Sequence, residues 1–208
     1  MNNPIVNEFV SLMVQLLVSL LVWRYYRRRI TSVSEKYSTF GPRFWTGCVD
    51  ACVMWPVGFL VTAMLTIHLP AAFAAAAVLG QSLVWLCYTV RMHAKHGQTY
   101  GKMVCYVKVV DFKSEGAISF RQALVREVIP ILTSLGILGY EIYALLTGIL
   151  SPEAVARGDL GKTTPMLLLG SLPGLWFFAE VITMLTNEKR RALHDFLAGT
   201  VVIRTDAA

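Results

Sequence analysis

Long apolar runs, separated by shorter polar segments rich in Arg and Lys, dominate the pattern of hydrophobic and polar positions along this chain. A bilayer core about 30 Å thick requires roughly 20 apolar residues in a helix, so each sufficiently long run predicts a membrane-spanning helix. Five stretches qualify, and they are Ile5–Trp23, Phe44–His68, Ala71–Val90, Val128–Leu150 and Pro165–Thr186. The second and third are separated by a tight turn at His68 to Pro70.

The pattern changes after Gly101, where residues 104–112 are rich in β-branched and aromatic side chains. A turn-like Ser-Glu-Gly at 114–116 precedes Ala-Ile-Ser, which predicts a strand, a turn and a second strand. Residues 200–204 form another strand-like run. The expected fold is therefore an all-α membrane protein, a bundle of five transmembrane helices with a small β element.

Composition agrees with a membrane protein, because 55% of the 208 residues are hydrophobic and only 15% are charged. Soluble domains usually carry about 25% charged residues. The sequence shows no nucleophile motif, phosphate-binding loop or metal-ligand spacing, so we expect no enzyme activity, no cofactor and no metal site. The net charge of +6 comes from basic residues beside apolar runs, which favours a role in topology over nucleic-acid binding.

The distribution of Lys and Arg predicts the orientation. Residues 24–43, 91–126 and 187–208 together hold seventeen of them, whereas the loop 151–164 holds only Arg157 and Lys162. Because basic loops stay in the cytoplasm, we expect the N-terminus outside, the C-terminus and the β element inside, and a multi-pass protein of a bacterial cytoplasmic membrane. Residues 1–40 would form an N-terminal transmembrane anchor with a basic juxtamembrane segment, and residues 41–208 the main transmembrane domain.

Two surface patterns suggest contacts with lipid or protein. The run Arg24 to Arg29 is typical of a topology anchor, and anionic lipid at the inner surface is the alternative partner. Ala72, Ala76 and Gly80 recur every four residues, a spacing that permits close helix approach. This stripe more often marks packing within a protein than the seam of a homo-oligomer.

Three acidic residues, Asp50, Glu141 and Glu180, lie more than one helical turn inside predicted spans. An ionisable residue in a span is costly and by default faces a partner or a cavity. At 1.5 Å per residue, Asp50 and Glu180 both lie about 9 Å inside the inner end of their spans, whereas Glu141 lies about 20 Å from that side. We therefore expect Asp50 and Glu180 to share one polar pocket, which a cation or an arginine such as Arg43 or Arg126 can enter, and Glu141 to form a separate site.

Three segments resemble the RDD family, which is named for one arginine and two aspartates. Residues 41–60 place Arg43 at the start of a span, residues 97–127 contain Gly-x-Thr-x-Gly-Lys followed by Val-Val-Asp and Ser-Phe-x-x-Ala-Leu-x-Arg, and residues 190–204 contain Leu-His-Asp-x-x-Ala-Gly-Thr. The resemblance implies that Arg43, Asp50 and Asp195 are the signature residues. Pro42 stands where a second basic residue is common, and Tyr106 stands where Gly is expected, which suggests that close backbone packing is not retained there.

The segment that contains Asp195 permits two interpretations. A His beside an Asp, as in His194–Asp195, can pass protons near neutral pH. Alternatively, Asp195 pairs with Arg43 or caps a helix, so that Arg190, Arg191 and His194 dock the C-terminal segment on the second span. The docking interpretation is favoured, because this short segment must be tethered to the inner surface.

The resemblance implies two functions, since some members of the family have been associated with cation–proton exchange and others look like components of larger membrane assemblies. The first hypothesis is a small cation- or proton-coupled transporter, with Asp50, Glu180 and Glu141 along the pathway. The second is a non-catalytic assembly or scaffold subunit of a membrane complex. Five spans form a thin wall for a transport pathway, so transport would require a homo-oligomer or a membrane-protein partner.

The charge bias gives a direct test of topology. In a cysteine-free background, single cysteines at Glu8 and Arg157 should react from outside intact cells with an impermeant thiol reagent, and cysteines at Arg27, Lys113 and Arg204 should not. Labelling of position 113 from outside would contradict the orientation.

Overall fold

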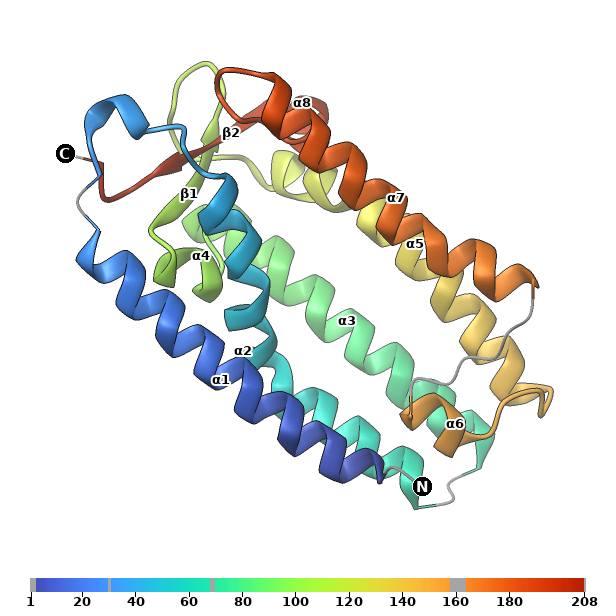
Figure 1. Cartoon of the computed structure of the whole chain (residues 1–208). Coiled ribbons are helices and arrows are strands. Elements are labelled where there is room, and N and C mark those ends of the chain that lie inside the picture. The colour runs from blue at the N-terminus through green and yellow to red at the C-terminus, as the bar shows by residue number, and fades with distance from the viewer. Residues whose placement is uncertain (1–2, 30, 68–69, 158–163, 208) are drawn as a thin grey trace.

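The computed structural model describes residues 3–29, 31–67, 70–157 and 164–207, and five long helices dominate it (Figure 1). All five are long and apolar enough to cross a membrane. The long helices are α1 (Pro4–Arg28), α2 (Phe40–Thr66), α3 (Ala71–His96), α5 (Phe120–Leu146) and α7 (Thr164–Thr186). The short elements are η1 (Val33–Glu35), α4 (Tyr100–Val104), β1 (Val107–Asp111), α6 (Pro152–Ala156), α8 (Leu193–Ala198) and β2 (Thr200–Arg204).

The five predicted spans are confirmed, and the largest difference in boundaries concerns α5. This helix begins at Phe120 because Ser119 and Gln122 form a capping box, in which each side chain accepts a hydrogen bond from the other residue's backbone N–H. It ends at Leu146, two residues before Gly148, whose φ of +73° is left-handed. The predicted turn at His68, and Lys162 in the loop 151–164, lie outside the described residues.

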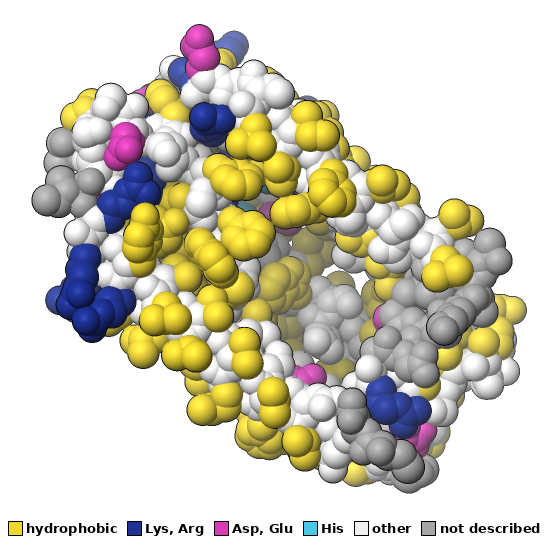
Figure 2. Space-filling view, in the orientation of Figure 1, with side chains coloured by type: hydrophobic (Ala, Val, Ile, Leu, Met, Phe, Trp, Pro, Cys, Tyr) yellow, Lys and Arg dark blue, Asp and Glu magenta, His cyan; other side chains and the backbone are white. Residues whose placement is uncertain are grey.

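The helices are arranged as an open arc in the order α1, α2, α3, α5, α7, with each packed on the next. Helix α7 makes its main contacts with α5 and α8. The side of the molecule between the α1–α2 pair and α7 is hollowed, and acidic and histidine side chains are visible inside it (Figure 2). The sheet and α8 lie at one end of the long helices, here called the sheet end, and α6 lies at the opposite end of these helices (Figure 1).

The small sheet is present, but one of its predicted strands is wrong. Strand β1 pairs antiparallel with β2, from Val107 opposite Arg204 to Asp111 opposite Thr200. The Ala-Ile-Ser segment at 117–119 forms no strand, because Ile118 is buried in the core and Ser119 caps α5. The partner of β1 therefore comes from the C-terminal segment.

The core is divided into two clusters, one at each end of the long helices. At the sheet end, buried residues of β1, β2 and α5 pack against Val22 and Tyr26 of α1. At the other end, Ala74, Ala75 and Val78 of α3 pack against α2 and α5. The small residues expected to pack inside the protein, Ala72 and Ala76, are exposed instead, so the close helix contact uses the neighbouring face of α3.

Tyr106 adopts a left-handed backbone conformation with a φ of +54°. Glycine reaches this conformation without steric cost, whereas other residues rarely do. The sequence suggested that Tyr106 marks a loss of close packing where Gly is expected. The structure shows that the conformation suited to Gly remains, and that the Tyr106 side chain packs against the core at the sheet end.

Gly97 gives a test of the join between α3 and the sheet. Its φ is +68°, and an added Cβ would lie 2.5 Å from the carbonyl oxygen of Val109. We expect Gly97→Ala to lower the free energy of unfolding by at least about 1–2 kcal/mol from the left-handed backbone alone, measured by thermal unfolding in detergent. The control is Gly139→Ala in α5, where a Cβ meets nothing within 4 Å and should be neutral or slightly stabilising. An equal change in the free energy of unfolding in both variants would show that the left-handed backbone at Gly97 does not require glycine.

Candidate functional site

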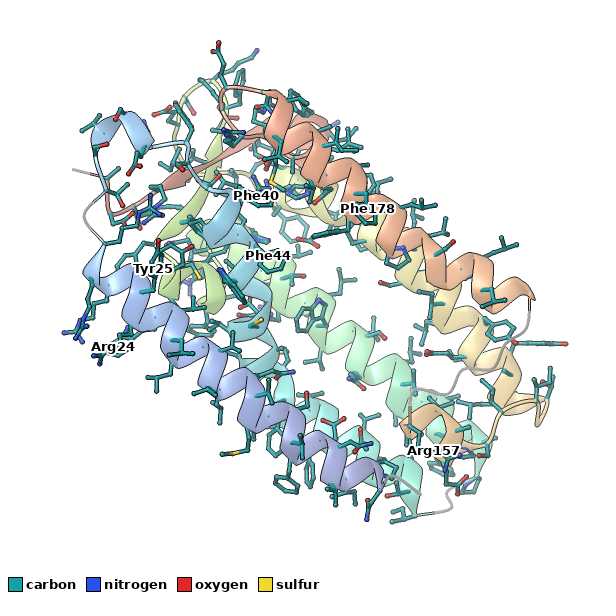
Figure 3. All side chains as sticks on the ribbon, in the orientation of Figure 1. Arg24, Tyr25, Phe40, Phe44, Arg157 and Phe178 are labelled. Atoms are coloured by element: carbon teal, nitrogen blue, oxygen red, sulfur yellow. The ribbon has the colours of Figure 1, made fainter. Side chains whose placement is uncertain are left out.

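A cleft of about 410 Å³ opens between α2 and α7 near the sheet end. We call it the charged cleft, because ionisable side chains from six helices line it. In Figure 3, Phe40 and Phe44 on α2 lie on one side of the hollow and Phe178 on α7 lies on the other. The ionisable residues that line the cleft are Arg43, His93, Lys102, Arg126, Glu127, Glu180 and His194.

Asp195 is fully buried and pairs with two arginines that line the charged cleft. Its carboxylate lies 2.8 Å from a guanidinium nitrogen of Arg43 in α2 and contacts the guanidinium of Arg126 in α5. The Thr200 hydroxyl also donates to this carboxylate at 3.1 Å. The contact between Asp195 and Arg43 that the sequence suggested is therefore present, and Arg126 joins it.

The position of Asp195 follows from the local sequence. Its carboxylate accepts a hydrogen bond of 2.9 Å from the backbone N–H of Ala192 and so caps α8, while Gly199 ends the helix in a left-handed conformation. Burial alone would raise the pKa of Asp195, but the guanidinium groups of Arg126 and Arg43 outweigh burial and hold this pKa well below its usual value. Asp195 is thus a charged, fully buried anchor.

The arginines that precede α8 hold the same segment. Arg191 donates to the carbonyl oxygens of Thr200 and Asp195, both at 2.9 Å, and its guanidinium lies 4.1 Å from the ring centroids of Phe112 and Phe196. The carbonyl oxygen of Arg190 accepts a hydrogen bond of 3.2 Å from Arg43. Both residues therefore contact the structure around α8, as the docking interpretation expects.

His194 connects this anchor to Glu180. Its Nε2 lies 3.0 Å from Arg43 and 2.9 Å from Arg126, and both guanidinium groups can only donate. Nε2 therefore accepts, which leaves the proton on Nδ1, where it points at the Glu180 carboxylate. Burial and then the nearby Arg126 lower the pKa of His194, in agreement with a neutral ring.

The charged cleft also contains residues that the sequence analysis did not single out. Nδ1 of His93 in α3 lies 3.4 Å from the carboxylate of Glu127 in α5. Lys102 enters from α4, and burial lowers its pKa. Glu127 falls one residue before the predicted span, and Lys102 belongs to the Gly-x-Thr-x-Gly-Lys segment, so neither lies within a predicted span, where a charged residue is conspicuous.

Asp50 is buried and hydrogen-bonded on both carboxylate oxygens. It accepts from the hydroxyls of Tyr88 and Thr99, both at 2.7 Å, and from the backbone N–H of Gly101 at 2.8 Å. At Gly101, an added Cβ would lie 2.2 Å from the carbonyl oxygen of Thr46, so only glycine permits this approach. Asp50 thereby joins α2 to α3 and to the start of α4.

The structure does not bring Asp50 and Glu180 to a common partner among the described residues. Asp50 bonds to α3 and α4, Glu180 contacts His194, and Asp50 is not among the residues that line the charged cleft. The shared carboxylate pocket that the sequence suggested receives no support from these contacts. Arg43 and Arg126 do lie beside Glu180, but their carboxylate partner is Asp195.

Glu141 occupies a different site, as the sequence predicted from its depth. It lines a cleft of about 520 Å³ near α6, together with Glu8 of α1 and Arg157. Among the described residues, no group of three His, Cys, Asp or Glu side chains is arranged to hold a metal ion.

The five apolar helices and the charged cleft between them define a multi-pass membrane protein. Residues 37–199 match the model of the RDD family, and the chain belongs to this family. The matched residues begin after α1.

The chain is similar to the uncharacterized membrane protein YteJ of Bacillus subtilis (strain 168), with 31% identity over 104 residues. That alignment covers 47% of this chain and 63% of the relative, so the chain spans less than two thirds of the relative's length. No solved structure gives a significant match.

Asp195→Asn tests the buried anchor. Removal of one partner from a buried charge network typically costs about 3–5 kcal/mol, so the variant should unfold at a clearly lower temperature in detergent at pH 7. Because folding lowers the pKa of Asp195, its contribution is present above the unfolded pKa and is lost as pH falls through the folded pKa. The difference from wild type should therefore be constant above about pH 5 and shrink below about pH 4.

The matched control is Glu188→Gln, an equal charge change at an exposed residue shortly before α8. It should change stability by less than about 0.5 kcal/mol. A stable Asp195→Asn protein that had lost only a specific activity would assign Asp195 to function instead of architecture.

Proposed function

We propose that this RDD family protein is a small proton-coupled cation transporter of a bacterial cytoplasmic membrane, with its sheet end in the cytoplasm. The observation that carries the proposal is a series of three clefts that follow one another along the inside of the arc. Along this proposed route, neighbouring clefts share lining residues, and each of the three contains polar side chains. The proposal assigns no enzyme activity to the chain.

The route begins at the charged cleft at the sheet end. A middle cleft of about 310 Å³ shares Glu127 and Pro130 with it. The middle cleft in turn shares Gln81 and Ser82 with the cleft near α6, which contains Glu141. Polar side chains therefore accompany the route from one end of the spans to the other.

The middle cleft holds polar groups within a mostly apolar lining. Besides Glu127 and Gln81, these include hydroxyl groups on α3 and α5. The hydroxyls of Ser82 and Thr89 donate to backbone carbonyl oxygens of α3 and can accept a further hydrogen bond. Ionisable residues within spans are expensive and typically mark ion pathways or proton relays. Among the described residues, the carboxylates that line the three clefts are Glu180, Glu127, Glu141 and Glu8, whereas Asp50 and Asp195 are each held by several donors of the protein.

Acidic and basic residues balance one another at the charged cleft. Arg43, Lys102 and Arg126 stand against Glu127 and Glu180 in the lining and against the buried Asp195 that pairs with both arginines. With both histidines neutral, this set carries no net charge, so a proton and a monovalent cation would compete for the two lining carboxylates. The pair of His93 and Glu127 offers two adjacent atoms for such a proton.

The open side of the arc favours a second candidate, an assembly subunit. Because the hollow between the α1–α2 pair and α7 faces outward, a second copy or another membrane protein would be needed to close the route (Figure 2). The same surface would serve a scaffold that binds a membrane partner and transports nothing.

Purified protein in liposomes with a pH gradient and an interior pH dye distinguishes the candidates. We expect a cation-dependent dye response, reduced at least about tenfold in Glu180→Gln and in Glu127→Gln, because each removes a titratable carboxylate from the route. Glu188→Gln, outside all three clefts, should retain the wild-type rate. A silent wild-type protein that is correctly inserted and co-purifies with a membrane partner would overturn transport and support the assembly role.

A further inference from the structure

A basic patch surrounds the sheet end of α1, outside the charged cleft. Arg24, Arg28 and Arg29 line a shallow groove of about 460 Å³ together with Leu21 and Tyr25. Figure 2 shows basic side chains gathered beside hydrophobic ones at this end of α1, and Figure 3 shows Arg24 directed away from the bundle. We call this surface the basic groove.

An apolar groove continues from the basic groove along the bundle. It has a volume of about 540 Å³, lies between α1 and the start of α2, and shares Leu21, Tyr25 and Arg29 with the basic groove. Most of its lining is apolar, and Gly41 leaves room there because it has no side chain. The other lining residues are Val18, Val22, Tyr26, Ser38, Pro42 and Trp45.

The arginines of the basic groove differ in how far the protein neutralises them. Arg29 lies 3.3 Å from the Glu35 carboxylate and 3.5 Å from the Tyr25 hydroxyl. Among the described residues, Arg24 and Arg28 form no ion pair, so their charges remain available to a ligand. Arg27 belongs to the same run but lies outside both grooves, with its guanidinium 5.0 Å from the ring centroid of Trp23.

We propose that the two grooves together bind one anionic phospholipid from the surrounding bilayer. Guanidinium groups match phosphate oxygens in charge and geometry, so Arg24 and Arg28 would hold the headgroup phosphate. The acyl chain would lie in the apolar groove between α1 and α2. A soluble phosphate would use only the basic groove, and a neutral lipid only the apolar one, whereas an anionic lipid uses both.

The site has a structural consequence for α1, which precedes the residues that match the family. The segment between α1 and α2 is held at the sheet, where the backbone N–H of Arg204 donates to the carbonyl oxygen of Lys36 at 2.8 Å and its guanidinium donates to Thr31 at 3.1 Å. A lipid in the grooves contacts α1 and α2 together. Bound lipid would therefore hold α1 against α2 and the rest of the bundle.

Purified protein stripped of native lipid, in a neutral detergent, tests the site. Titration with phosphatidylglycerol should raise the unfolding temperature and yield a one-to-one complex in native mass spectrometry, whereas phosphatidylcholine and inorganic phosphate should not. Removing one basic residue near an anionic surface should weaken binding about fivefold, so Arg24→Gln combined with Arg28→Gln should weaken it about 25-fold.

The matched control is Arg27→Gln, which removes the same charge from the same run. It should change phosphatidylglycerol affinity by less than about twofold, because Arg27 lies outside the grooves. An equal loss in Arg27→Gln would overturn the proposal and leave a non-specific topology anchor. Equal binding of phosphatidylcholine, or saturation by inorganic phosphate, would overturn it as well. The unfolding temperature of each variant without lipid shows that the fold is intact, so any loss reports on the site.

Discussion

The arrangement of the sheet end depends on one buried carboxylate held between two guanidinium groups. Asp195 is 0% exposed, and its partners Arg43 and Arg126 come from helices separated from it by 152 and 69 residues in sequence. In a low-dielectric interior, a buried charge that loses its partner is strongly destabilising, so the three residues specify one another. The ion pairs join α2, α5 and α8 and thereby fix where β2 begins.

The same contacts decide how charge is distributed in the cleft. Two guanidinium groups beside one carboxylate leave one positive charge without a direct carboxylate partner. His194 lies between these guanidinium groups and the Glu180 carboxylate: its Nε2 accepts from both arginines, and its Nδ1 donates to Glu180. Arg43 and Arg126 are thus balanced by Asp195 and Glu180. Because Nε2 accepts from both guanidinium groups and Nδ1 faces the Glu180 carboxylate, the ring of His194 has a fixed tautomer and orientation.

The sequence was sufficient for the parts of the fold that depend on composition and period. Apolar length located all five spans, since the bilayer sets that length, and β-branched residues located β1 and β2. It failed where tertiary contacts decide the outcome. Residues 117–119 have strand-like neighbours, but the capping box at Ser119 and the burial of Ile118 direct them into the start of α5.

The site was predictable only in part for a related reason. The resemblance identified Arg43, Asp50 and Asp195, and residue types alone suggested the contact of Asp195 with Arg43. Equal depth in two spans suggested that Asp50 meets Glu180, but depth does not specify the direction in which a side chain points around the helix. Asp50 instead faces the helix that begins after Thr99, and Lys102 and Glu127 lay outside the apolar runs in which charged residues attract notice.

A division between two kinds of acidic residue follows from these contacts. Asp50 and Asp195 each accept several hydrogen bonds or ion pairs from groups that belong to the fold, so protonation of either would leave buried donors without acceptors. Glu127 and Glu180 each contact a single histidine and line the charged cleft, so protonation of either would affect one contact, between α5 and α3 or between α7 and α8. The aspartates that the family resemblance singles out therefore have the chemistry of a framework. The transport that we propose would therefore use the glutamates, which line the cleft and have fewer partners in the protein.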